Sequence, residues 1–110
     1  NWYSCTDFTT SNDSEIVQNF VKSFNTKYGE DPELYAVTYY SAIYLLKDAI
    51  ERAGSLDSAA IRDALAATDG LQVPIGTYKA NEMREMVHGG TICKMVDGKA
   101  EFLEYVLVKD

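Results

Sequence analysis

The sequence predicts an α/β fold in which three helices are followed by a C-terminal β-hairpin. The helices are indicated by apolar residues that recur at helical spacing in three stretches, residues 12–28, 32–53 and 57–67. The hairpin is indicated by Asp97-Gly98, which separates two strand-like runs at residues 91–96 and 101–108. Asp-Gly between two such runs is the strongest short hairpin signal.

Length and composition suit one ordinary globular domain. The chain has 110 residues, of which 46% are hydrophobic and 25% charged, with a formal net charge of −7. This charge argues against nucleic acid as a partner, because phosphates require a basic patch and the sequence has none. No apolar run reaches transmembrane length. The chain starts without Met or a signal-peptide core, so we expect it to be processed or excised.

The first predicted helix follows a short strand and a loop. Residues 1–5 are apolar enough to be the end of a strand, and residues 6–13 resemble a turn-rich loop. Asn12 with Glu15 three positions later forms a capping-box pattern, which predicts that the helix begins there. Gly29 is suited to the left-handed residue that ends it.

The second predicted helix is the longest element. Asp31 is the expected N-cap, Pro32 fits the first helical position, and Gly54 can end the helix. Its roughly 22 residues would span about 33 Å. Residues 34–46 carry no charge, which predicts burial on every side. A chain this short has little room to surround such a helix, so we expect part of that burial to come from elsewhere.

The third helix is expected to begin at Asp57 as N-cap and to end near Ala67. Residues 71–73 and 76–78 are predicted as short extended pieces separated by Pro74. Residues 79–90 show no clear period and are expected to form a loop.

No group of residues suggests catalysis. His88 is the only histidine and has no second ligand at metal spacing, so a surface position is the simpler interpretation. The acidic group Glu30, Asp31 and Glu33 lacks the pattern of a calcium loop and fits helix-start electrostatics better. We therefore expect a protein that is not an enzyme and that has neither a metal site nor a cofactor.

Tyrosines and cysteines are the remaining candidates. Tyr35 and Tyr39 on the long helix, with Tyr3 near the N-terminus, are the candidate ligand-binding residues. The alternative is that they are core residues with hydroxyls at the rim. The two cysteines, Cys5 and Cys93, either form a disulfide or are free buried thiols, and the sequence leaves both open.

The ordered set of local motifs resembles the C-terminal third of the type I periplasmic binding proteins, in the branched-chain amino-acid-binding group of ABC importers. The motifs are FVKSF at 20–24, KYGEDP at 27–32, YA at 35–36, YSA at 40–42, DAIERAG at 48–54, AIRDAL at 60–65, GTY at 76–78 and VDGK at 96–99. The resemblance spans nearly the whole chain in the right order. The sequence departs from it at Ser41, where many relatives have an acidic residue.

The resemblance implies a two-lobed α/β clamshell that closes on a small ligand and binds and releases it without covalent chemistry. Residues 1–110 would be one C-terminal fragment, with 1–90 closing one lobe and 91–110 returning to the other. The implied ligand is a branched-chain or related amino acid, and the implied partner is an ABC permease in the membrane. The implied location is extracytoplasmic, in the periplasm or as a cell-surface lipoprotein. Among the tyrosines, the family's aromatic position falls on Tyr35.

The same resemblance implies that Cys5 and Cys93 lie close together, near the hinge and the returning strands. A second hypothesis keeps the fold but makes the chain a ligand-sensing domain of a receptor or regulator. A third is an interaction module with no small ligand. Because a sheet edge and an apolar helix face would be left uncovered, we also expect the fragment to self-associate.

Overall fold

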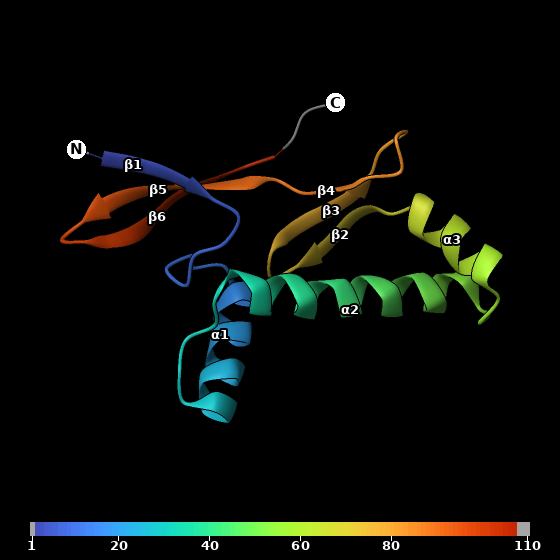
Figure 1. The fold of residues 1–110 in the computed structure, drawn as a ribbon, viewed down its shortest axis with the longest axis horizontal. Coiled ribbons are helices and arrows are strands. Elements are labelled where there is room, and N and C mark those ends of the chain that lie inside the picture. The colour runs from blue at the N-terminus through green and yellow to red at the C-terminus, as the bar shows by residue number, and fades with distance from the viewer. Residues whose placement is uncertain (1, 108–110) are drawn as a thin grey trace.

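The computed structural model describes residues 2–107 and contains three helices and two small antiparallel sheets (Figure 1). The helices are α1 (Glu15–Tyr28), α2 (Leu34–Ala53) and α3 (Ser58–Ala66). The strands are β1 (Trp2–Thr6), β2 (Asp69–Val73), β3 (Gly76–Ala80), β4 (Met86–Val87), β5 (Gly90–Val96) and β6 (Lys99–Val106). The predicted α/β fold with three helices and a C-terminal hairpin is confirmed.

The first sheet has the strand order β1-β5-β6 and joins the two ends of the chain. Trp2 lies opposite Met95, and Thr6 lies opposite Thr91. The predicted hairpin is formed by β5 and β6. Asp97 and Gly98 both have positive φ, at 49° and 78°, as a type I′ turn requires. The end of the predicted strand at Val108 lies outside the described residues.

The second sheet has the order β2-β3-β4 and lies along one side of α2 (Figure 1). Pro74 and Ile75 form the turn between β2 and β3, as the sequence predicts. The stretch 79–90 differs from the expected loop, because Met86–Val87 pairs with Lys79 and Ala80 of β3. Two residues carry too little pattern to predict a strand, and the neighbouring strand supplies the pairing.

The ends of α1 and α2 and the start of α3 agree with the sequence, whereas the starts of α1 and α2 do not. Gly29 and Gly54 end α1 and α2 in the left-handed conformation, and the Asp57 carboxylate caps α3 by accepting from Ala59 and Ala60 N–H groups at 3.0 and 3.1 Å. The predicted N-caps Asn12 and Asp31 are each two residues too early. The observed caps, Ser14 and Glu33, make no side-chain capping bond.

The reason is that both predicted caps have other partners. The Asn12 side chain accepts a hydrogen bond from the Ser14 N–H at 2.9 Å, before the helix begins. The Asp31 carboxylate accepts one from the side chain of Asn25 at 3.1 Å, which ties the α1–α2 loop back to α1.

The core is small and lies between α1, α2 and the β2–β3 turn. Its buried members are Phe20, Val37, Val73, Ile75 and Tyr78. The molecule is also extended, with a radius of gyration of 15.5 Å and extents of 50 × 36 × 19 Å. A compact domain of this length has a radius of gyration of about 13 Å. The chain is therefore less compact than an ordinary single domain of the same length.

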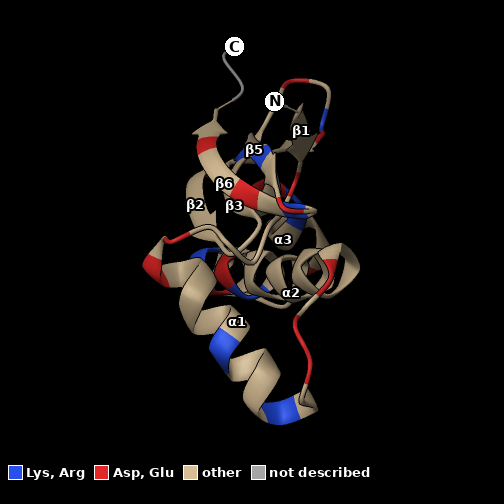
Figure 2. Ribbon diagram, turned by 90° about the vertical axis from the view of Figure 1, so that its left-hand side faces the viewer, with Lys and Arg blue, Asp and Glu red and all other residues tan. Residues whose placement is uncertain are grey.

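Charged residues are dispersed over the surface, and Figure 2 shows acidic and basic positions interspersed along the elements that face the viewer. Three ion pairs within residues 2–107 join residues that are close in sequence. Lys47–Glu51 and Arg52–Asp48 lie one turn apart on α2, and Arg62 pairs with the adjacent Asp63. Among residues 2–107, no helix has the length and hydrophobicity needed to cross a membrane.

Candidate functional site

The long helix α2 has one face that the chain buries. Val37, Ser41 and Ala49 are each fully buried and follow one another at intervals of four and eight residues. This face packs on the turn between β2 and β3. The hydroxyl of Ser41 accepts a hydrogen bond from the backbone N–H of Ile75 at 3.3 Å. Ser41 therefore holds the β2–β3 turn against α2 through this hydrogen bond.

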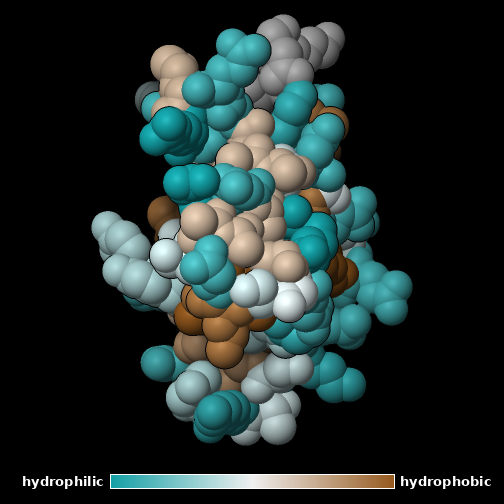
Figure 3. All heavy atoms as spheres, turned by 90° about the vertical axis from the view of Figure 1, so that its right-hand side faces the viewer, coloured by the Kyte–Doolittle hydropathy of each residue, from teal (hydrophilic) through white to brown (hydrophobic). Residues whose placement is uncertain are grey.

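The opposite face of α2 is aromatic and aliphatic yet open to solvent. Tyr35, Tyr39 and Ile43 follow one another at four-residue spacing and are 76%, 73% and 66% exposed, and Leu46 is 42% exposed. We call these four residues the open face of α2. The prediction that the helix is buried on every side is wrong for this face, because no other element of the described chain covers it. Seen from the α3 end, hydrophobic side chains lie open at the surface among hydrophilic ones (Figure 3).

Tyr40 and Tyr44 lie between the two faces. The Tyr40 hydroxyl donates a hydrogen bond to that of Tyr44 at 3.2 Å, and the Tyr40 ring lies 4.6 Å from that of Phe20. The hydrogen bond with Tyr44, helped by burial and by the Tyr44 charge, raises the pKa of Tyr40 to about 12. This pair is thus tied to the core, in contrast to Tyr35 and Tyr39.

Tyr35 occupies the first turn of α2, where the open face begins. Because Glu33 makes no side-chain capping bond, the N–H groups of this first turn are not taken by a side-chain cap. An exposed ring next to such N–H groups can offer a ligand an aromatic surface, a hydroxyl and backbone donors. The neighbouring carboxylates of Asp31 and Glu33 oppose a purely anionic ligand, so a ligand that also carries a positive charge suits this position better.

The structure brings together two of the three candidate tyrosines. Tyr35 and Tyr39 share the open face of α2, one turn apart. Tyr3 lies on β1 in the other sheet, opposite Lys94, and is 60% exposed. All three are accessible, and sequence alone did not distinguish them from core residues.

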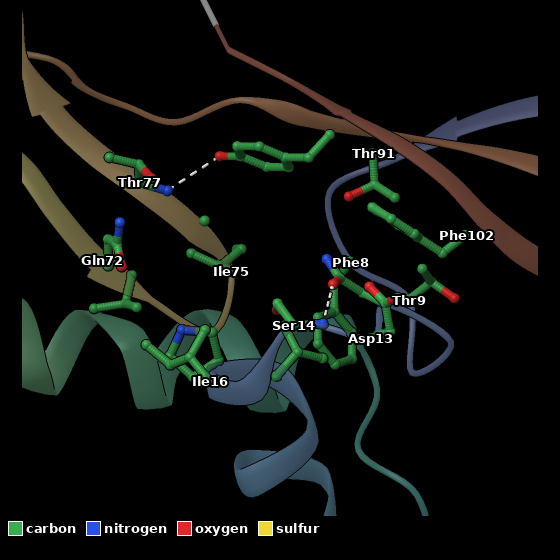
Figure 4. A pocket seen from close by; sticks show the side chains of 16 residues that line it. Phe8, Thr9, Asp13, Ser14, Ile16, Gln72, Ile75, Thr77, Thr91 and Phe102 are labelled. Atoms are coloured by element: carbon green, nitrogen blue, oxygen red, sulfur yellow. Dashed lines mark hydrogen bonds between the residues drawn. The ribbon is translucent and has the colours of Figure 1, made fainter.

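A cleft of about 280 Å³ lies where the two sheets meet the start of α1 (Figure 4). Rings and hydroxyls from four segments line it, including Phe8, Ser14, Thr77, Thr91 and Phe102. Thr91 is only 2% exposed. None of the three candidate tyrosines lines this cleft, and the sequence gave no signal for it because its walls come from residues far apart in the chain.

Cys5 and Cys93 lie on adjacent strands, as expected, and both are free thiols. Ser4 lies opposite Cys93, and Cys5 lies opposite Ile92. Since successive residues of a strand point to opposite faces, the two side chains leave the sheet on opposite sides. A disulfide requires both Cβ atoms to approach from one side, so this register holds the thiols apart.

Metal chemistry has no support from the geometry. Within residues 2–107, histidine, cysteine and carboxylate side chains form no group of three or more that could hold an ion. His88 lies beside the Tyr78 ring, and its Nδ1 lies 2.7 Å from the carbonyl oxygen of Gly89. It is therefore engaged in local structure.

Three solved structures share the fold of this chain. The chain is 29% identical to a protein assigned to a branched-chain amino acid ABC transporter of Rhodospirillum rubrum, with a TM-score of 0.85 over 92% of this chain and 30% of that one. It is 26% identical to the branched-chain amino acid transporter substrate-binding protein LivJ of Streptococcus pneumoniae, solved with isoleucine, with a TM-score of 0.78 over 96% of this chain and 30% of that one.

A solute-binding protein of an ABC transporter from R. palustris, solved with benzoate, shares the fold at 23% identity, with a TM-score of 0.79 over 98% of this chain and 31% of that one. The family model described as periplasmic binding protein matches residues 1–100, and the chain belongs to this family. No curated protein matches the chain. The chain spans about 30% of the length of the solved structures to which it is similar.

Proposed function

We propose that the chain is the C-terminal part of a two-lobed solute-binding protein of an ABC importer, and that this protein binds a branched-chain or related amino acid by hinge closure. Family membership and the likeness to the isoleucine complex at 26% identity support this ligand class. The open face of α2 is the observation that carries the proposal. Tyr35 and Tyr39 are more than 70% exposed on this helix. In the complete protein, this face can therefore contact both the ligand and other segments of the protein.

The two sheets suggest how the chain is shared between lobes. In our proposal, α1–α3 and the β2-β3-β4 sheet close one lobe, and β5 and β6 return to the other. β1 pairs with β5, so Trp2–Thr6 belongs with the returning strands rather than with the rest of residues 1–90. The chain then crosses between lobes twice, through residues 7–14 and 88–89.

Within this arrangement, Tyr35 contacts the ligand, and Tyr39 and Tyr3 are further candidates. The ring of Tyr35 and the N–H groups of the first turn of α2 can face the apolar side chain and the carboxylate of an amino acid. The carboxylates of Asp31 and Glu33 lie in the preceding segment and suit the ligand's ammonium group. A benzoate-like ligand has no such group.

The site is tested by Tyr35→Ala in the complete protein that carries this chain. We expect affinity for leucine, isoleucine or valine to fall by about 1–3 kcal/mol, through the lost ring contact and hydroxyl. The matched control is Tyr44→Ala, farther along the same helix, which should lower stability and leave affinity unchanged. Titration calorimetry measures both. Equal affinity for Tyr35→Ala and the parent protein would show that Tyr35 does not contact the ligand.

The partner and location follow from the same proposal. The complete protein would deliver its ligand to a membrane permease and would act outside the cytoplasm. Reconstituted transport with its permease tests the first point, and cell fractionation tests the second. A protein that binds amino acids but supports no transport would favour a sensory role.

A further inference from the structure

The side chain of Tyr105 joins the two sheets. Tyr105 lies on β6 in the first sheet, and its hydroxyl oxygen accepts a hydrogen bond from the backbone N–H of Thr77, on β3 in the second sheet, at 3.1 Å (Figure 4). The same oxygen accepts a second bond from the N–H of Gly89 at 2.8 Å. Gly89 lies in the short segment that connects β4 to β5. One phenol oxygen thus holds a strand of one sheet and the crossing between the sheets.

Two glycines make room for this ring. A Cβ atom at Gly76 would lie 2.8 Å from Cζ of Tyr105, and one at Gly89 would lie 2.7 Å from the same carbon. Real Cβ atoms do not approach another carbon so closely, so a side chain at Gly76 would displace the ring, and one at Gly89 would meet both the ring and the backbone carbonyl oxygen of Val106 on β6. Gly76 also has a φ of 144°, a conformation that side chains disfavour. Backbone and ring are therefore fitted to one another at this point.

If one sheet rotates relative to the other, the two hydrogen bonds to the Tyr105 hydroxyl must either move with it or break. Residues 7–14 and 88–89 connect the sheets covalently, and such crossings can bend through their backbone dihedral angles. The Tyr105 bonds add a noncovalent connection between β6 and β3 that holds at one relative angle of the sheets. Gly89 is buried, so its N–H would lose its partner without gaining full access to water.

We propose that Tyr105 is a positioning residue, whose hydroxyl fixes the angle between the two sheets and thereby how far the two lobes are open without ligand. The inference rests on the proposed two-lobed function. A narrow range of angles keeps a larger fraction of the unliganded protein competent to bind. Apparent affinity is the intrinsic affinity multiplied by that competent fraction. Tyr105 would therefore raise affinity without touching the ligand.

The test is Tyr105→Phe in the complete protein, with one spin label on each lobe. Without ligand, we expect a broader distribution of distances between the lobes than in the parent protein. With saturating L-leucine, the distance should match that of the parent. Affinity for L-leucine should fall about two- to tenfold, as expected for one or two lost hydrogen bonds acting through the competent fraction. Gly89→Ala, whose Cβ would meet both the Tyr105 ring and the Val106 carbonyl oxygen, should broaden the distribution at least as much.

The matched control is Tyr28→Phe, which removes a hydroxyl from the exposed end of α1 and should change neither the distances nor the affinity. If Tyr105→Phe lowers only the melting temperature and leaves the ligand-free distance distribution unchanged, the proposal is overturned. The distance measurement needs no ligand. If the complete protein binds no amino acid, the proposed function is contradicted. The distances measured without ligand still test the role of Tyr105.

Discussion

The two faces of α2 both lack charged residues at these positions but have opposite surroundings. On one face, Val37, Ser41 and Ala49 are fully buried, and Val37 and Ser41 lie against the β2–β3 turn. On the other, Tyr35, Tyr39 and Ile43 are each at least 66% exposed. Hydrophobicity alone therefore does not decide which residues of this helix are inside. The second sheet and α1 cover only one side.

The described residues provide packing partners for one face of α2 and none for the other. The buried face has the β2–β3 turn beside it, a hydrogen bond from the N–H of Ile75 to Ser41, and Phe20 of α1 in the same core. The open face has none of these within residues 2–107. A contiguous exposed apolar face on a helix marks a surface for further contacts. In our account, the rest of the two-lobed protein covers it.

The largest expected effect separates the two faces directly. Val37→Ala removes two buried methyl groups and should lower the free energy of unfolding by about 2–3 kcal/mol. Ile43→Ala removes more atoms, but from a solvent-exposed side chain, and should change it by less than about 0.5 kcal/mol in the 110-residue chain. Urea denaturation followed by circular dichroism measures both.

The same pair sharpens the comparison in the complete protein. If the open face is covered there, Ile43→Ala should cost about 2–5 kcal/mol, as for a buried isoleucine. A cost that stays below about 0.5 kcal/mol in both proteins would mean that the open face is exposed in the complete protein as well.

A smaller effect is expected at Ser41. Ser41→Ala leaves the N–H of Ile75 buried without an acceptor and should cost about 1–2 kcal/mol of stability. The control is Thr38→Ala, whose hydroxyl bonds back to the Leu34 carbonyl within the same helix at 2.8 Å and joins no second element. Thermal denaturation of both variants provides the comparison. Equal losses would mean that the bond from Ile75 adds nothing specific.

The two cysteines should differ in how fast they react with a thiol reagent. Burial raises the pKa of the Cys93 thiol, with a further contribution from Cys5 and partial relief by the Thr9 side chain. Since the thiolate is the reactive form, Cys93 should react slowly with a thiol reagent and the exposed Cys5 quickly. We expect one fast thiol in the native protein and two after unfolding. No reactive thiol in the unfolded, unreduced protein would reveal a disulfide.

The smallest effect concerns Tyr40 at alkaline pH. Its pKa is about 12 in the folded chain, against 10.0 for an unperturbed tyrosine. A raised pKa means that the neutral form is favoured by folding, so this stabilisation is complete below about pH 10 and is lost as the pH rises through about 12. Tyr40→Phe should flatten the loss of stability over this range. Urea midpoints taken across it test the slope, and an unchanged slope would contradict the assignment.

Local signals predicted much of the fold. Gly29, Gly54, Asp57 and the Asp97-Gly98 turn act on their immediate neighbours, and all were placed correctly. The starts of α1 and α2 were wrong by two residues because the side chains of Asn12 and Asp31 bond to Ser14 and Asn25 instead of capping a helix. The pairing of β1 with β5 joins residues about 90 positions apart, and a local pattern cannot specify it.

The candidate site was less predictable. Helical spacing placed Tyr35 and Tyr39 on one face of α2, but their exposure depends on what the chain does not cover. The two hydrogen bonds to Tyr105 join residues 16 and 28 positions apart. The cleft of about 280 Å³ is lined by segments that lie still farther apart in the sequence. Gly76 and Gly89 were visible in the sequence, yet nothing there connected them to a tyrosine on β6.

The central claim is that this chain provides one wall of an amino-acid site and is incomplete without the rest of the protein. Titration calorimetry with leucine, isoleucine and valine, combined with light scattering, tests it most directly. We predict that the complete protein binds at least one of the three, and that the 110-residue chain binds none tightly and self-associates through the open face of α2. A compact monomer of the 110-residue chain that binds one of them with micromolar affinity would contradict the account.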